Sequence, residues 1–314
     1  MGENMSTAPR VSVGLAVYNG EKYLDQAIRS ILGQTFSDFE LIISDNASTD
    51  GTAEICASYA ARDSRIRYSR NDRNIGGANN GNRTFRLARG EYFRWAAHDD
   101  VCAPTLFERC VAVLDERPEV VLCYTDAVEI DEHGREKGVA SAPEFASSEA
   151  FDRFRFLSGR RKHKGEAAYG LVRSRILGRT RLLLNYTSSD RVLLCELACH
   201  GPFHQLHEPL FYKRHHPGNE YKDWRGRMAW FLPDLQQTGQ VTFPNWMEFF
   251  DYFATLKRAP IDSRQKALCY SWLVGPWLLQ HGKGLVKDVL EGAYLMTRPV
   301  ELRRAKYRDM QSWL

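Results

Sequence analysis

The sequence predicts an α/β fold in which a mostly parallel, Rossmann-like sheet carries helices on both faces. Over the first 125 residues, short apolar runs alternate with stretches whose apolar residues recur at helical spacing. Alternating strands and helices are typical of parallel sheets. A chain of 314 residues, of which 43% are hydrophobic and 26% charged, is long enough for one large or two modest domains.

The predicted elements follow one another closely along the chain. The short apolar runs that indicate strands are Val11–Val17, Phe39–Ile43, Arg65–Tyr68, Glu91–Ala96 and Val120–Tyr124. The stretches with helical spacing are Glu21–Leu32, Thr52–Ala61, Ala78–Ala88 and Pro104–Glu116. The last of these has proline in its first turn, where the missing N–H costs nothing.

The rest of the chain is polar at first and then helical. Asp126 to Lys164 is rich in glycine, serine and charged residues, with six cations between Arg153 and Lys164. A strand is expected at Ala167–Val172, a helix at Asp190–His200 and a second strand at Pro209–Lys213. Tryptophan-rich helices are expected beyond Asp223, after a soft boundary near Asn219. The cationic cluster is either a lid over a ligand or a solvated surface.

Composition excludes several classes of protein. A net charge of +4 is too mild to indicate a nucleic-acid partner. No run approaches the ~20 apolar residues that cross a bilayer, and no apolar signal segment follows the first residues. Seven cysteines without a CxxC pair indicate a reducing compartment, so a cytoplasmic location is expected. Cys195 and Cys199 are predicted to be core residues of a helix.

Polar residues cluster where three predicted strands end. The segments that follow the first, second and fourth strands are Tyr18-Asn-Gly20, Asp45-Asn-Ala-Ser48-Thr-Asp50-Gly51 and His98-Asp99-Asp100. Ligands of open α/β sheets bind beyond these carboxyl ends. Neither a dinucleotide fingerprint nor a P-loop is present. A divalent cation held by carboxylates would therefore have to neutralise any bound phosphates. Taken singly, each acid is equally well explained by turn or helix-end chemistry.

Taken together, these segments resemble the family 2 glycosyltransferases. The segments that carry the resemblance are Val11–Asn19, Tyr23-Leu24, Gln34-Thr-Phe36, Phe39–Asp50, Asn74-Ile-Gly76, Asn82, Ala88–Tyr92 and Trp95–Asp100 with Pro104. The match runs in order over residues 11–125, and weaker echoes reach about residue 219.

The resemblance implies the GT-A fold and the inverting transfer of a sugar from a nucleotide-diphosphate donor. The acceptor would be a hydroxyl of a saccharide or of a lipid-linked molecule, as in the assembly of bacterial surface polysaccharide or glycolipid. Residues 1–125 would form the nucleotide-sugar-binding half, residues 126–219 the acceptor-binding half, and residues 220–314 a helical extension. A sugar nucleotidyltransferase and a catalytically inactive relative are the alternatives.

The resemblance also implies roles for particular residues. The implied nucleotide-binding residues are Ala16, Tyr18, Asn19, Asp45, Ser48, Asn74 and Asp99. Asp99 takes the last position of the family's Asp-x-Asp motif and, with His216, would bind Mg²⁺ or Mn²⁺. The first position of that motif is Ala97, which leaves strict metal dependence open. The residues implied near donor or acceptor are His98, Asp100 and Arg214.

The chain departs from the family's pattern at two further places. Ala16 stands where the family usually has proline, and Asn46-Ala47 stands where it usually has Asp-Gly. The second change should alter the turn on the ribose side without removing Asp45.

The resemblance places the catalytic base at Asp190. The segment Ser188-Ser189-Asp190 fits the family's acidic motif before a helix. An acceptor hydroxyl must lose its proton as it attacks, and a carboxylate within hydrogen-bond reach can accept it. The competing interpretation is that Asp190 only caps its helix.

Two aromatic features have open interpretations. Trp95 either stacks near a sugar or fills the sheet core. The C-terminal segment from Asp251 has 11 Lys or Arg against 6 Asp or Glu. It is either a solvated helical surface or a surface for peripheral contact with the inner membrane face, with Leu273–Leu279, Lys283 and Lys287 as its suggested apolar and basic parts.

Overall fold

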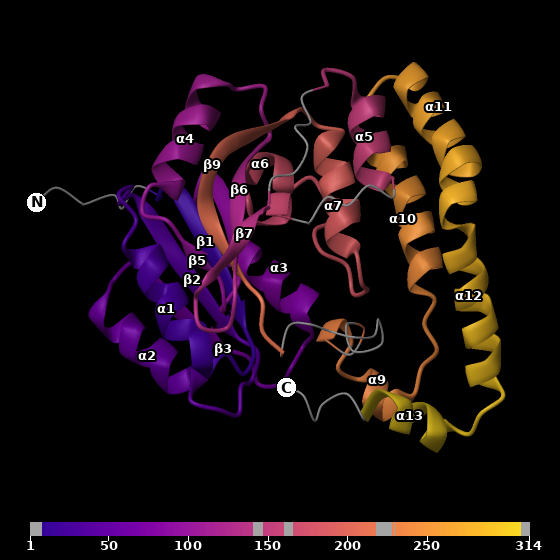
Figure 1. Cartoon of the computed structure of the whole chain (residues 1–314), viewed down its shortest axis with the longest axis horizontal. Coiled ribbons are helices and arrows are strands. Elements are labelled where there is room, and N and C mark those ends of the chain that lie inside the picture. The colour runs from indigo at the N-terminus through magenta and orange to yellow at the C-terminus, as the bar shows by residue number, and fades with distance from the viewer. Residues whose placement is uncertain (1–7, 141–146, 160–165, 218–227, 229, 309–314) are drawn as a thin grey trace, which may run out of the picture.

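The computed structural model describes residues 8–140, 147–159, 166–217, 228 and 230–308 (Figure 1). Its strands form one sheet with the order β3-β2-β1-β4-β8-β6-β9-β5, and β7 pairs with β6. The strands are β1 (Val11–Val17), β2 (Phe39–Asp45), β3 (Ile66–Arg70), β4 (Tyr92–Ala96), β5 (Val101–Cys102), β6 (Leu122–Ile130), β7 (Glu136–Ala140), β8 (Leu171–Arg173) and β9 (Phe203–Arg214). The predicted α/β class is confirmed.

Helices cover both faces of this sheet (Figure 1). They are α1 (Glu21–Leu32), α2 (Thr52–Arg62), α3 (Gly77–Leu87), α4 (Leu106–Glu116), α5 (Ala150–Ser158), α6 (Ser174–Leu177), α7 (Ser189–Ala198), α9 (Leu235–Thr238), α10 (Pro244–Arg258), α11 (Ser263–Trp272), α12 (Leu278–Met296) and α13 (Val300–Arg308). A 3₁₀ turn, η1 (Glu166–Tyr169), precedes β8, and a π-helical turn, η2 (Leu273–Trp277), joins α11 to α12.

The first half is a parallel sheet, as predicted. β1 pairs in parallel with β2 and β4, and β2 pairs in parallel with β3. Successive residues of a strand point to opposite faces. Accordingly, Tyr92 of β4 enters the core beneath α1 and α4, whereas Phe93 enters the core beneath α5 and α7. Parallel pairing brings the carboxyl ends of β1, β2, β3 and β4 to one edge.

The second half mixes strand directions, and one predicted strand there is partly wrong. Residues 166–169 form η1, and only Leu171–Arg173 pairs as β8, antiparallel to β4 and β6. The reason is a close approach at Gly170, where an added Cβ would lie 2.8 Å from the carbonyl oxygen of Cys123. β9 begins at Phe203, earlier than predicted. Its Pro209 is tolerated because the β6–β9 pairing shifts register at Asp126.

The first residue of the cationic cluster, Arg153, belongs neither to a lid nor to a solvated surface. Arg153 is buried, and its guanidinium donates to the carbonyl oxygens of Ala198, Ser147 and Ser148. The later members from Arg160 to Lys164 lie outside the described residues. Arg153 therefore joins α5 to the end of α7.

The C-terminal helices pack against α5 and α7 through an aromatic core. Trp277 is buried and stacks on Phe249 at 5.3 Å and on His281 at 4.2 Å between ring centroids. Leu273 is buried as well, so two residues of the suggested membrane segment Leu273–Leu279 belong to the core. The expected boundary near Asn219 falls outside the described residues.

The structure also bears on the predictions for the cysteines, for Trp95 and for membrane-spanning helices. All seven cysteines are free and buried, which confirms Cys195 and Cys199 as core residues. Trp95 packs edge-to-face on Phe93 and donates its indole N–H to the Gly81 carbonyl at 2.9 Å, as expected of a residue that fills the core. Within the described residues, no helix combines the length and the apolar character that crossing a bilayer requires.

Candidate active site

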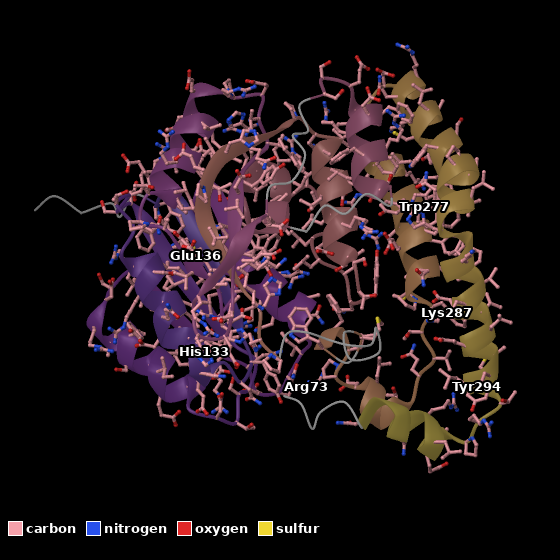
Figure 2. All side chains as sticks on the ribbon, viewed as in Figure 1. Arg73, His133, Glu136, Trp277, Lys287 and Tyr294 are labelled. Carbon is pink, nitrogen blue, oxygen red and sulfur yellow. The ribbon has the colours of Figure 1, made fainter. Side chains whose placement is uncertain are left out.

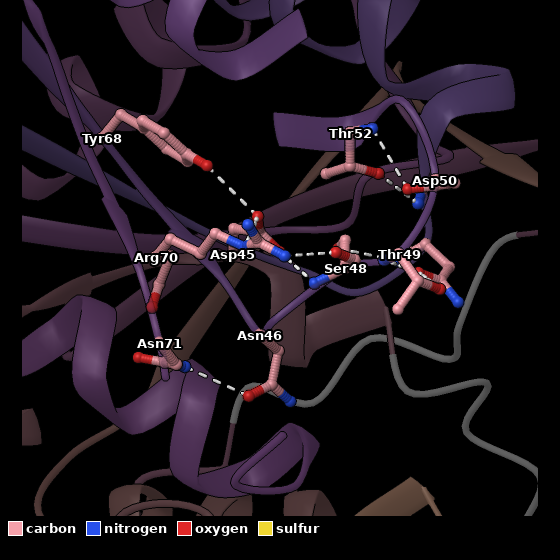
Figure 3. Close-up of polar contacts among 12 residues, drawn as sticks. Asp45, Asn46, Ser48, Thr49, Asp50, Thr52, Tyr68, Arg70 and Asn71 are labelled. Carbon is pink, nitrogen blue, oxygen red and sulfur yellow. Dashed lines mark hydrogen bonds and ion pairs between the residues drawn. The ribbon is translucent and has the colours of Figure 1, made fainter. Parts of the chain in front are cut away.

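The turn after β2 is organised around the buried carboxylate of Asp45 (Figure 3). One of its oxygens accepts a hydrogen bond from the backbone N–H of Ser48 at 2.8 Å. The other accepts from the Tyr68 hydroxyl at 3.2 Å and lies 3.4 Å from Nε of Arg70. Tyr68 and Arg70 come from β3, and no sequence motif pointed to them. The turn is thus held by a neighbouring strand as well as by its own backbone.

The turn after β1 is bonded directly to the turn after β2. The backbone N–H of Asn19 donates to Oγ of Ser48 at 3.0 Å, and Oδ1 of Asn19 accepts from the backbone N–H of Thr49 at 2.9 Å. Ala16, in register with Ser44, and Tyr18 are both partly exposed. The structure therefore brings four predicted nucleotide-binding residues of two strands, Ala16, Tyr18, Asn19 and Ser48, to one place.

Asn46, at one of the departures from the family's pattern, connects this turn to the start of α3. Its amide donates to Oδ1 of Asn74 at 2.7 Å, and its Oδ1 accepts from the backbone N–H of Ile75 at 2.9 Å. The Asn71 amide also donates to Oδ1 of Asn46, at 3.1 Å (Figure 3). Oδ1 of Asn74 also accepts from the N–H of Gly76. The side-chain oxygen of Asn74 is therefore engaged in holding this turn.

Ala47, the other half of that departure, has φ +63°, in the left-handed region that favours glycine. We expect Ala47→Gly to raise the free energy of unfolding by about 1 kcal/mol, because glycine relieves the steric cost of this conformation. Ala57→Gly, at an exposed position inside α2, is the matched control and should lower it by about 1 kcal/mol. Urea unfolding midpoints measure both. If both glycine variants were less stable than the unaltered protein, the left-handed backbone conformation of Ala47 would be contradicted.

Asp99 and Asp100 lie beyond β4 and face two residues at the end of β9. Oδ2 of Asp99 is 3.0 Å from Nε2 of His216, whose ring packs on Tyr23 at 4.9 Å between centroids. Oδ1 of Asp100 accepts from the backbone N–H of Arg214 at 2.8 Å. Burial, followed by the charge of the Asp99 carboxylate, raises the pKa of Asp100. The adjacent acids thus have different partners, as their strand-end positions predict.

Arg214 ties the loop after β4 to α1. Its buried guanidinium donates to the carbonyl oxygen of Asp99 at 2.8 Å and to Oε1 of Gln26 at 2.6 Å. It also donates to the carbonyl oxygen of Asp131 at 3.1 Å and lies over the Tyr23 ring. These contacts place Arg214 beneath Asp99, where it fixes the backbone that presents the carboxylate.

We expect Arg214→Ala to lower the free energy of unfolding by about 3 kcal/mol or more, because it removes a buried guanidinium that donates to the buried carbonyl oxygen of Asp99 and to the part-buried carbonyl oxygens of Asp131 and Glu132. Arg109→Ala is the matched control. Arg109 makes an exposed pair with Glu208, and its loss should cost less than about 1 kcal/mol. Chemical denaturation of the two variants beside the unaltered protein is the measurement. Equal losses would contradict the proposed stabilising role of the Arg214 contacts.

His98 connects the two groups of residues. Its ring packs on Gly20, so that a Cβ added at Gly20 would lie 2.7 Å from Cδ2 of His98. Gly20 itself donates its backbone N–H to Oγ1 of Thr52. The turns after β1, β2 and β4 therefore form one continuous surface at the carboxyl edge of the sheet.

A divalent cation fits the donor set at this edge. Asp99 and His216 supply a carboxylate oxygen and an imidazole nitrogen close enough to share an ion. Mg²⁺ and Mn²⁺ are commonly held by one or two protein carboxylates together with substrate phosphates. Within the described residues, no group of three or more His, Cys, Asp or Glu side chains is arranged around a common point. The fit is therefore to an ion whose remaining ligands are phosphate and water.

Asp190 lies in the first turn of α7, and the capping interpretation is wrong. The N-cap is Ser188, with φ +70°, and Asp190 is the second helical residue. Among the described residues, the Asp190 carboxylate takes part in no hydrogen bond that would hold it in such a cap.

Tyr169, which sequence reasoning missed, lies between the elements that carry the predicted acids. It belongs to η1, which packs against β4, β6 and α7, and its carbonyl oxygen accepts from Nε of Arg94 at 2.7 Å. Burial raises the pKa of the Tyr169 phenol, and so do three nearby carboxylates. In order of effect they are Asp100, Asp99 and Asp190. The two acids that follow β4 and the acid of α7 thus all raise the pKa of one side chain.

This architecture, a Rossmann-like sheet whose carboxyl edge carries Asp45 and Asp99 opposite a helix bearing Asp190, is that of the GT-A glycosyltransferases. The profile of the family described as Glycosyl transferase family 2 matches residues 12–176, more than half of the chain. The chain belongs to glycosyl transferase family 2.

Relatives and solved structures agree with this assignment. EpsE of Bacillus subtilis (strain 168), classed as a glycosyltransferase, is 37% identical over 131 residues, which are 41% of this chain and 47% of EpsE. The chain thus spans about half the length of this relative. S. aureus TarS 1-349, solved with UDP-GlcNAc, superposes with a TM-score of 0.65 at 16% identity, over 96% of this chain and 89% of TarS.

A second solved structure has the same fold. The mannosyltransferase PcManGT of Pyrobaculum calidifontis, solved with GDP-Man and Mn²⁺, superposes with a TM-score of 0.51 at 16% identity, over 92% of this chain and 88% of that one. At such identities the two superpositions show the shared fold alone.

Proposed function

We propose that the protein is an inverting glycosyltransferase that moves a sugar from a nucleotide-diphosphate donor to a hydroxyl of a saccharide or lipid-linked acceptor. The observation that carries this proposal is that η1 packs against both β4, which Asp99 and Asp100 follow, and α7, which bears Asp190 in its first turn. A single displacement needs one group on the donor side of the anomeric carbon and a base on the acceptor side. In this proposal Asp99 is the first and Asp190, on a separate helix, is the second.

Asp190 acts as the base in the proposed reaction. Its carboxylate accepts the proton of the acceptor hydroxyl as that oxygen bonds to the anomeric carbon. The bond between the anomeric carbon and the diphosphate oxygen breaks on the opposite face, so the configuration inverts. The nucleoside diphosphate leaves with the electron pair of that bond.

Asp99 and His216 hold the divalent cation in this proposal. When bound, the ion supplies positive charge that stabilises the departing diphosphate. Arg214 keeps the Asp99 backbone in position from below through its 2.8 Å contact with the Asp99 carbonyl oxygen.

The joined turns after β1 and β2 hold the nucleoside in this proposal. The partly exposed Tyr18 and Asn19 lie beside the Asp45–Ser48 turn, which is braced by Arg70 and Tyr68. The relatives solved with UDP-GlcNAc and GDP-Man support a nucleotide-diphosphate sugar as the class of donor. A lipid-linked acceptor and peripheral contact with the cytoplasmic face of a membrane complete the proposal.

A thermal-shift screen of UDP, GDP, dTDP and CMP, each with and without Mn²⁺, tests the proposed donor site. A ligand that binds only the folded protein raises its melting temperature. We expect one nucleoside diphosphate to stabilise the protein, and to do so more strongly with Mn²⁺. No response to any of the four nucleotides would contradict the donor site.

Nucleotide-sugar binding without turnover is a second candidate, favoured by Ala97 in the first position of the Asp-x-Asp motif. Donor consumption in the presence of acceptor separates the two candidates. Release of the nucleoside diphosphate supports the transferase, and binding with no release across the acceptors tried supports the inactive relative.

A further inference from the structure

Large exposed apolar side chains are concentrated on the C-terminal helices. Among the described residues, Val139 of β7 is the one such side chain that precedes residue 230. The others are Trp230, Phe250, Leu268, Val274, Leu279, Val286, Val289, Leu290, Tyr294, Met296 and Leu302. More than half of these belong to α12 or lie directly beside it.

α12 has two apolar faces, and only one of them is covered. Leu285 and Leu295 face the protein core, together with Gly292, which lies against the Phe243 ring. The opposite face carries Leu279, Val286, Leu290 and Tyr294, at successive intervals of seven, four and four residues, which place them on one side of a helix. Leu279 is 89% exposed and Leu290 is 65% exposed. We call these four residues the outer stripe.

Cations border the outer stripe. Lys283 and Lys287 are exposed along it, and the Arg298 guanidinium lies 4.7 Å from the centre of the Tyr294 ring. Lys287 and Tyr294 are labelled on α12 in Figure 2. Residues 263–304 contain 7 Lys or Arg against 3 Asp or Glu. One of these acids, Asp288, is buried. This segment therefore carries an excess of positive charge equal to the +4 of the whole chain.

We propose that the outer stripe of α12 is a docking surface for an anionic lipid membrane. Helices that lie in the membrane interface combine an apolar face with bordering Lys and Arg, which attract anionic headgroups. Lysine side chains can lay their methylene stems along the apolar stripe while the ammonium groups reach the headgroups. α12 lies at the edge of the molecule away from α1 and α2, where a flat surface can approach it (Figure 1).

The charges favour a lipid surface over a second copy of the chain. An isologous contact through the outer stripe would bring Lys283 and Lys287 of both copies into one interface. Glu291 is the one acid of α12 that is not buried, and it already pairs with Lys287 at 3.7 Å. Such a contact would collect cations without enough acids to pair them. An anionic bilayer supplies the missing negative charge.

The test measures binding of the full chain to vesicles. Flotation is run with vesicles of phosphatidylcholine and phosphatidylglycerol in equal parts, and with vesicles of phosphatidylcholine alone. The variant Leu279→Glu/Leu290→Glu places two carboxylates on the outer stripe. Val139→Glu is the matched control, because Val139 is 61% exposed on β7. Equal urea midpoints establish that the variants fold, which is expected because every altered side chain is exposed.

We expect the unaltered chain and Val139→Glu to bind the anionic vesicles, more weakly at high salt, and the double variant to bind at least about tenfold more weakly. Absence of binding by the unaltered chain, or equal binding by the double variant, overturns the proposal. Dimerisation in solution that the double variant abolishes would also overturn it, in favour of a second copy. This inference specifies the membrane contact of the proposed function, and its test does not depend on sugar transfer.

Discussion

Replacing Asp190 by asparagine is expected to lower the rate of sugar transfer by about 10²- to 10⁴-fold, the usual contribution of a general base. Asparagine keeps the size and shape of the side chain but cannot take up the proton of the acceptor hydroxyl. Asp190 lies on α7, apart from the turns that are proposed to hold the nucleoside, so binding of the donor should be unchanged. Initial rates at saturating donor, together with the thermal shift caused by the nucleoside diphosphate, measure the two effects separately.

The control for this variant is Asp38→Asn. Asp38 is exposed and precedes β2, so the same chemical change there should leave the rate of transfer within error. Full activity of Asp190→Asn would place the base at another residue. Loss of donor binding in the same variant would show that Asp190 acts on the donor side.

Replacing Asp99 by alanine is expected to remove the Mn²⁺-dependent part of nucleotide binding. Changes to residues that merely support metal ligands cost about 10- to 100-fold in affinity, so loss of a ligand should cost at least about a hundredfold. The Arg214 guanidinium contacts the backbone carbonyl of Asp99, so the substitution leaves that bond in place. Calorimetric titration of the nucleoside diphosphate, with Mn²⁺ and with a chelator, measures the effect.

The titration with a chelator shows whether the lost affinity is due to the ion. Without the ion, Asp99→Ala and the unaltered protein should bind the nucleotide equally. His216→Gln should give the same pattern, because His216 lies 3.0 Å from the Asp99 carboxylate and is the second ligand in the proposal. Unchanged affinity of Asp99→Ala in the presence of Mn²⁺ would refute the role of this carboxylate.

The parallel half of the fold could be predicted from sequence because its signals are local. β1 is a mostly apolar run, and α1 buries Leu24, Ile28 and Ile31 at helical spacing, so both coincide with the predicted ranges. The turns after these strands could be predicted as a site because parallel pairing brings the carboxyl ends of strands to one edge.

The other features depend on contacts that sequence periodicity does not encode. The resemblance implies a place near donor or acceptor for Arg214, but not its burial, because its partner Gln26 is 188 residues away in the chain. Tyr169 stands in a segment that reads as a strand, and only the close packing of Gly170 on β6 explains the turn. The sequence predicts Arg153 to be part of a lid or of a solvated surface, because the carbonyl oxygen of Ala198 that it contacts belongs to another segment. Such positions are identified by packing between elements.

The order of the strands in the sheet also sets the order in which a growing polypeptide can complete its site. β1 to β4 require nothing beyond residue 96, whereas β6 receives its neighbours β8 and β9 from segments that follow it. At about 5–20 residues per second, a ribosome takes roughly 5–20 s to proceed from β4 to the start of β9. During that interval β1 to β4 can pair with one another, while Asp99 and Asp100 still lack Arg214 and His216. The corner formed by Asp99, Arg214 and His216, which is the proposed metal site, is therefore the last part of the sheet edge to be assembled during synthesis.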